Sequence, residues 1–209
     1  TIMALTRLNN NAIGETITAA KGGTGVTSAD EIGNLVLLNS QTASSSSSIT
    51  FSSTYLTSTY KKYFLDYTDV TLSSDSSYTT FTVSYDNGSN YVSSGYRSLK
   101  IFNNDGSPNN DFSSNGQTNG TSVPMLGFHE NLGNATDEQG SGRVTIFDPH
   151  SADAKLFITE AVMINSGGNT ARQHAYASII TSSAINNIKI APATGTIDTG
   201  VFTLYGVKT

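Results

Sequence analysis

Apolar and polar residues alternate along most of the chain, and this pattern predicts β-strands. In residues 78–86, YTTFTVSYD, the side chains of Phe81, Val83 and Tyr85 share one face, whereas threonine and serine occupy the other. A period of two residues is typical of a strand that buries one face and exposes the other. Comparable segments recur from Ile49 to the end of the chain, and no helical period holds over any useful length. The chain is therefore expected to be all-β.

The end of the chain predicts two strands joined by a turn. The first runs through Ile188 and Ile190, a turn follows at Gly195, and the last strand reaches Val207. The two strands are expected to form a hairpin, and the last strand is expected to complete a sheet.

Turn-forming residues and regular strand spacing indicate the architecture. Asn87 and Gly88 favour a type I′ turn, so residues 91–102 are expected to return as the second strand of a hairpin. The polar residues at 103–122 exceed the usual length of a loop, which indicates a functional or mobile segment. The strands of residues 34–209 predict an antiparallel β-sandwich, in its simplest form an eight-stranded jelly roll.

Residues 1–33 lack this alternation, and an extended N-terminal arm is expected there. Their apolar residues are single and widely spaced, and the glycines of residues 21–25, KGGTG, interrupt the segment. Fully extended, the segment would reach about 110 Å. It is either an arm that becomes ordered against a partner or against identical chains, or a disordered terminus; the spaced apolar residues favour the arm. The candidate anchoring residues of this arm are Leu5, Leu8, Ile13 and Ile17.

Composition and charge exclude several classes of function. Charged residues make up 13% of the chain, against about 25% in an ordinary soluble domain. The net charge is −5 and only Lys61 and Lys62 are adjacent cations, so the basic stripe of a nucleic-acid-binding protein is missing. No membrane span and no secretory signal are expected, because no apolar segment has the necessary length. The absence of cysteine excludes disulfides and thiolate metal sites.

Candidate catalytic groups are few, and the chain is expected not to be an enzyme. His129, His150 and His174 are not accompanied by a GxSxG nucleophile motif, so structural roles are expected for all three. Glu160 is the only acid within a clearly apolar run. The Glu160 side chain has three possible environments, a pocket, a subunit interface or solvent. The alternation of the strand favours solvent. No catalytic, cofactor-binding or metal-binding residue is assigned.

Two loops supply oxygen atoms suited to calcium, but ordinary turns are favoured. Residues 86–90, DNGSN, and 103–107, NNDGS, lack the acidic spacing of an EF-hand. Most of the ten tyrosines are expected to pack against cross-strand neighbours. A receptor-binding patch near residues 103–122 is the alternative interpretation. The candidate receptor-facing residues are Asn104, Asp105, Asn109, Asn110 and Asp111.

Three segments carry a resemblance to virion proteins of tailed bacteriophages. Residues 4–25, ALTRLNNNAIGETITAAKGGTG, resemble the N-terminus of short tail-fibre and fibre-like proteins, especially those of marine phages, in which an A-L-T-x-L-N-N phrase precedes a glycine-rich hinge. Residues 200–206, GVFTLYG, are similar to the phrase G-x-[IF]-x-LYG in the last strands of β-sandwich domains of the same proteins. Residues 49–70 resemble the start of such a domain. The motifs mark a virion structural module rather than one protein.

The resemblance implies a bacteriophage short tail fibre, a homotrimer in which residues 1–33 attach to the virion and residues 34–209 form a β head that faces the host surface. The implied partners are other virion structural proteins and a glycan or protein of the host, without nucleic acid or membrane insertion. The implied location is the particle surface, after assembly in the host cytoplasm. The chain contains no coiled-coil shaft of the kind that long fibres have, which leaves a capsid head fibre or a shell-stabilising decoration protein as an alternative. A lectin-like glycan-binding module is a second alternative.

Overall fold

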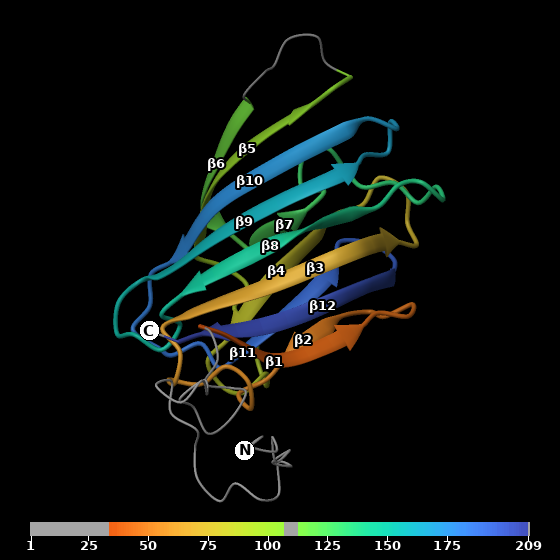
Figure 1. Cartoon of the computed structure of the whole chain (residues 1–209). Helices are drawn as coiled ribbons and strands as arrows, with labels where there is room; N and C mark the ends of the chain where they lie inside the picture. The colour runs from red at the N-terminus through yellow and green to blue at the C-terminus, as the bar shows by residue number, and fades with distance from the viewer. Residues whose placement is uncertain (1–33, 107–112, 209) are drawn as a thin grey trace, which may run out of the picture.

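Two antiparallel sheets pack face to face in this chain (Figure 1). The structure, a computed structural model, describes residues 34–106 and 113–208, so the arm expected at residues 1–33 lies outside the described residues. The described residues form twelve strands and no helix. The larger sheet has the order β1 (Leu35–Thr42), β12 (Ile197–Val207), β3 (Lys62–Leu72), β8 (Gly140–Phe147), β9 (Lys155–Ile164), β10 (Thr170–Ile179), β5 (Tyr96–Asn104), β6 (Ser113–Gly120). The smaller sheet has the order β2 (Ile49–Phe51), β11 (Asn187–Pro192), β4 (Thr79–Ser84), β7 (Val123–Leu126).

The strand order is that of a jelly roll with four additional strands. The chain passes repeatedly between the sheets, which produces the two orders β1-β12-β3-β8 and β2-β11-β4-β7. This arrangement confirms the expected jelly-roll-like antiparallel sandwich. Two insertions, β5 with β6 and β9 with β10, continue the large sheet beyond β8 and widen it to eight strands.

The core forms between the sheets because each strand turns alternate apolar residues inward. On β3, Leu65 and Tyr67 are buried, whereas Asp66 between them points outward. Phe202 of β12 is fully buried and stacks on Tyr67, with ring centroids 6.3 Å apart. Phe81 of β4 meets Phe157 of β9 edge to face at 5.2 Å. These residues belong to a single core cluster, so the inserted strands share the core of the jelly roll.

The last two strands do not form the hairpin that the sequence predicted. β11 pairs with β2 and β4 in the small sheet, whereas β12 lies between β1 and β3 in the large one. Gly195, with a φ of 73°, makes the expected turn, but this turn crosses from one sheet to the other. A turn signal is local, whereas the pairing of each strand is decided by the burial that the whole sandwich achieves. The expectation that the last strand completes a sheet is confirmed.

The turn at Asn87 and Gly88 also forms without the predicted hairpin. Their φ angles, 60° and 88°, lie in the left-handed region that a type I′ turn requires. However, β4 and β5 belong to different sheets. The backbone N–H of Asn87 donates instead to Oδ1 of Asn186 at 2.9 Å. The turn therefore packs against the segment that leads into β11, and the chain leaves for the other sheet.

The polar segment at residues 103–122 is not one long loop. β5 continues to Asn104, and β6 occupies much of the second half of the segment. Apart from Gly120, the residues of β6 whose burial is described are exposed, and β6 lies at the edge of the sheet, paired only with β5. Backbone pairing rather than side-chain burial holds this strand, which is why the alternation pattern did not reveal it.

The loop after β4 contains a carboxylate held by hydrogen bonds. Asp86 accepts one from the Ser84 hydroxyl at 2.7 Å and two from Asn90, through the backbone N–H at 2.8 Å and through Nδ2 at 2.7 Å. These bonds, that of Ser84 first, lower the pKa of Asp86 from 3.8 to about 2. Because the pKa is lower in the folded chain, the ionised carboxylate stabilises the fold above pH 3.8, and this contribution is lost as the pH falls through about 2.

An NMR titration of the Asp86 side-chain carboxyl is therefore expected to have its midpoint near pH 2. The Asn90→Ala variant removes the Nδ2 donor and keeps the backbone N–H, so it is expected to raise the midpoint toward the ordinary value. A wild-type midpoint at 3.8 would mean that the carboxylate does not hold these hydrogen bonds in solution.

Candidate functional site on the outer face of the large sheet

The two outer faces of the sandwich differ in polarity. On the outer face of the large sheet, Leu37 is 60% exposed and Leu156 is 53% exposed. The outward positions of the small sheet include Thr50, Thr82 and Lys189 instead. Contiguous exposed apolar surface of this kind marks interaction sites. The exposed large apolar residues on the outer face of the large sheet are Leu35, Leu37, Leu99, Leu156, Val162, Tyr176 and Val201.

Cross-strand pairing aligns apolar side chains in one row across the large sheet. Phe64 of β3 pairs with Tyr205 of β12 on one side and with Thr145 of β8 on the other. Tyr176 of β10 pairs with Ile158 of β9 in the same way. The row crosses seven strands and is apolar apart from its threonine. This apolar row comprises Leu37, Tyr205, Phe64, Thr145, Ile158, Tyr176 and Leu99.

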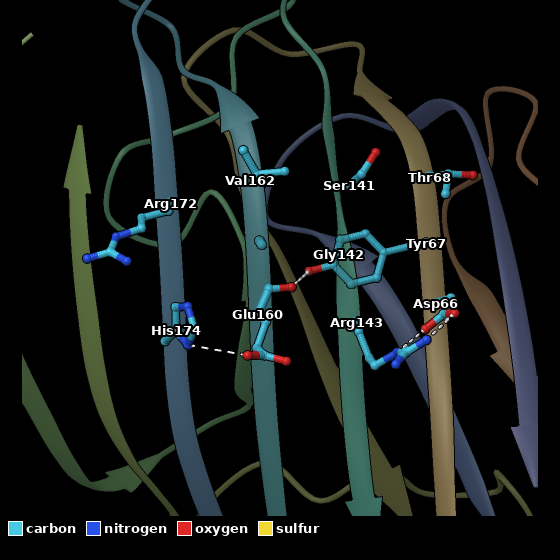
Figure 2. A pocket seen from close by; sticks show the side chains of 11 residues that line it. Asp66, Tyr67, Thr68, Ser141, Gly142, Arg143, Glu160, Val162, Arg172 and His174 are labelled. Carbon is cyan, nitrogen blue, oxygen red and sulfur yellow. Dashed lines mark hydrogen bonds and ion pairs between the residues drawn. The ribbon is translucent and has the colours of Figure 1, made fainter. Parts of the chain in front are cut away.

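A second row, two residues further along the strands, carries charge. It consists of Asp66 on β3, Arg143 on β8, Glu160 on β9 and His174 on β10, each paired with the next across the sheet (Figure 2). Acidic and basic groups therefore alternate along this charged row. The row lies across the middle of the sheet, because four strands lie on each side of the boundary between β8 and β9.

Specific contacts hold the charged row. The Arg143 guanidinium donates to both carboxylate oxygens of Asp66, from Nε at 2.5 Å and from Nη2 at 2.8 Å. It also lies over the Phe64 ring, 4.4 Å from the centroid. Donation of these hydrogen bonds to Asp66 raises the pKa of Arg143. Nδ1 of His174 lies 3.6 Å from Oε1 of Glu160. Exposed ion pairs add little to stability, so this row suits orientation and recognition better than support of the fold.

A shallow depression of about 510 Å³ runs beside the charged row and extends to Val162 and Arg172 (Figure 2). Tyr67 closes its floor: the phenol is buried against Gly142, and its hydroxyl lies 3.2 Å from the Glu160 carbonyl and 3.3 Å from the Met125 carbonyl. Burial raises the pKa of Tyr67. The phenol therefore stays neutral and acts as structural support.

The open shape and the paired charges suit binding to a surface rather than enclosure of a small substrate. Within residues 34–106 and 113–208, no group of three or more histidine, aspartate or glutamate residues is placed to hold a metal ion. The same part of the chain contains no helix with the length and apolar character needed to cross a membrane.

The histidines singled out from the sequence do not come together. His129 stacks on Phe102 with ring centroids 3.3 Å apart, and Nε2 of His150 lies 3.1 Å from the Leu56 carbonyl. His174 is outward on β10, where it alternates with Arg172 and Tyr176 as expected. Glu160 also points outward and is exposed, as its alternation favoured.

The candidate receptor-facing and anchoring residues are described only in part. Asn104 ends β5, and Asp105 follows it, exposed, with its backbone N–H donating to the Thr170 carbonyl at 3.1 Å. The other candidates lie outside the described residues; they are Asn109, Asn110, Asp111, Leu5, Leu8, Ile13 and Ile17. The sequence did not point to Asp66 and Arg143 as neighbours, because only strand pairing brings them together.

Comparison of the chain with models of known protein families finds no match, and comparison with curated proteins finds none either. The basis for a functional proposal is therefore the geometry above together with the sequence resemblance.

Proposed function

We propose that this chain is a non-enzymatic structural protein of a tailed-bacteriophage particle, a short tail fibre whose β head faces the host. In this role residues 1–33 anchor the chain on the particle through Leu5, Leu8, Ile13 and Ile17. The resemblance of residues 4–25, 49–70 and 200–206 to phage fibre proteins supports the proposal. The all-β sandwich is the kind of head that this resemblance implies.

The observation that carries the proposal is that the start of the sandwich and a candidate host-facing residue lie at opposite ends of the strands. The described chain begins at Asn34, next to Leu35, which pairs with Val207 at one end of the large sheet. Asn104 pairs with Ala171 at the opposite ends of β5 and β10. Asn34, where residues 1–33 join the sandwich, and Asn104 therefore lie at opposite ends of the strands, which is what a fibre head requires.

The exposed apolar face is a second support. Burial of one large apolar side chain contributes roughly 1.5–3 kcal/mol, and several such side chains share the outer face of the large sheet. A chain with this face gains stability when it assembles. This favours a subunit of a multi-copy structure over an isolated lectin-like domain. Several weak host contacts made together would compensate for the weakness of each one.

The anchoring role predicts a specific loss. In the full chain, replacing Leu5, Leu8, Ile13 and Ile17 together with serine is expected to reduce the copies per particle at least about tenfold, because the apolar contacts with the particle are removed. Quantitative mass spectrometry of gradient-purified particles measures this number.

A matched control replaces Asn11, Thr16 and Thr18 with serine in the same segment, outside the A-L-T-x-L-N-N phrase, and it should leave incorporation unchanged. Normal incorporation of the variant without the four apolar residues would refute the anchoring role. Incorporation into the capsid shell rather than the tail would instead support the decoration-protein alternative.

A further inference from the structure

The charged row points to the occupant of the apolar face. We infer that a second copy of this chain packs against the outer face of the large sheet, around a two-fold axis parallel to the strands and midway between β8 and β9. This inference rests on the proposed role as an assembly subunit. It replaces the homotrimer that the resemblance implies with a two-fold pair of chains.

The order of charges selects this axis. The rotation exchanges β8 with β9 and β3 with β10, so Arg143 faces Glu160 of the second copy and Asp66 faces His174 of the second copy. Each member of the charged row thus has a group of complementary character opposite it as well as beside it. Complementary charges of this kind fix the register of an interface and reject other arrangements.

Neighbouring axes bring like charges together. An axis along β8 would place Arg143 against Arg143 of the second copy. It would also place Asp66 against Glu160 of the second copy. An axis along β9 would place Glu160 against Glu160 of the second copy. It would also place Arg143 against His174 of the second copy. Like charges brought together in an interface weaken it strongly.

The boundary between the two central strands avoids both conflicts. The boundaries on either side of it also avoid them, but they place Glu160 opposite Thr203 or Arg143 opposite Ile101. Only the central boundary therefore gives all four members of the charged row a complementary group.

The same rotation matches the apolar groups. Phe64 of β3 faces Tyr176 of the second copy, and Tyr205 of β12 faces Leu99. An axis perpendicular to the strands, along the apolar row, would instead place Glu160 against Leu156 and leave the carboxylate without a polar partner. Burial of an unpaired charge is costly, so the axis parallel to the strands is favoured on apolar and polar grounds alike.

The size of the face is sufficient for a stable dimer. Strands about 4.8 Å apart make the large sheet about 34 Å wide, and four outward rows about 6.6 Å apart extend about 20 Å along the strands. The footprint of about 700 Å² per copy is close to the roughly 800 Å² that each partner buries in a standard interface. Packed sheets cross at about 30°, a rotation that leaves the pairs nearest the axis opposite one another. Two-fold dimers are also the commonest homo-oligomers.

Charge reversal with rescue by mixing tests this contact. Sedimentation equilibrium of the full chain is expected to give twice the chain mass of 22.0 kDa. Arg143→Glu places glutamate against glutamate in both opposing pairs, and Glu160→Arg places arginine against arginine. Each variant alone is expected to dimerise at least about 100-fold more weakly. An equimolar mixture is expected to recover the double mass, because every opposing pair is then one acid and one base.

Lys189→Glu is the matched control. It makes the same change of charge on the small sheet and is expected to leave the dimer intact. Tyr176→Ser, at an outward position that is 46% exposed, provides a second break that does not touch the core. It is expected to weaken the dimer at least about tenfold.

A wild-type chain at its single mass or at three times that mass would overturn the two-fold contact. So would charge variants that dimerise like the wild type, or variants with wild-type circular dichroism whose mixture stays at the single mass. A monomeric chain that still joins particles would overturn this inference and leave the virion role standing. A dimer that joins no particle would overturn the virion role and leave this inference standing.

Discussion

Phe202→Ala is expected to lower the free energy of unfolding by about 4 kcal/mol. Phe202 is fully buried on β12, the strand that lies between β1 and β3, and its ring stacks on Tyr67. Truncation removes its apolar burial and leaves a cavity between the two sheets, which the close-packed core can only partly fill. Denaturant unfolding followed by far-ultraviolet circular dichroism measures the loss.

The neighbouring residue supplies the control. Val201 lies on the same strand, points outward and is 38% exposed. Val201→Ala is expected to change the free energy of unfolding by less than about 1 kcal/mol. Equal losses at the two positions would mean that β12 does not present one face to the core and the other outward, and the sandwich described here would be wrong.

Gly142→Ala is expected to destabilise the chain by about 3 kcal/mol. A Cβ at Gly142 would overlap the backbone carbonyl of Glu160 and would lie 2.5 Å from the Tyr67 hydroxyl. The carbonyl belongs to the paired strand and cannot move aside as a side chain can. Relief of the overlap must therefore separate β8 from β9, the two strands at the middle of the large sheet. Thermal and denaturant unfolding of the variant measure the loss.

Gly116→Ala is a suitable control for this substitution. Gly116 also lies in a strand of the large sheet, but the nearest atom to its added Cβ would be the Ser98 carbonyl oxygen at 3.9 Å. The variant is expected to stay within about 0.5 kcal/mol of the wild type. If Gly142→Ala were equally well tolerated, the close approach of Tyr67 and β9 to Gly142 would be absent in solution. Because the charged row lies on the same strands, Gly142→Ala is also expected to weaken the proposed dimer.

The alternation of the sequence predicted the faces of strands better than their partners. Phe81 and Val83 are fully buried on β4, as their spacing indicated. The turns at Asn87 and Gly195 were placed correctly, since a positive φ depends on local residue type. The partners of β11 and β12 were not, because pairing depends on which arrangement of all the strands buries the most apolar surface. β6 was not predicted, because backbone pairing at the edge of the sheet holds it and those of its side chains whose burial is described show no alternation.

The candidate site could not be predicted from sequence spacing. Asp66, Arg143, Glu160 and His174 come from four strands and meet only through pairing between residues that are distant along the chain. Glu160 was a candidate because an acid interrupts an apolar run, and the structure places it between Arg143 and His174 in the charged row. The apolar row was hidden because each of its members is an ordinary residue for a strand. Only the shared register makes these residues a continuous surface.

Electron microscopy of an intact particle that carries this chain tests the proposed role most directly. The expected image contains jelly-roll density that projects from the tail, with the start of β1 directed toward the particle and the Asn104 end of the large sheet directed away from it. A chain found free in solution and missing from the particles would contradict the proposal. So would sandwich density held in the reverse orientation.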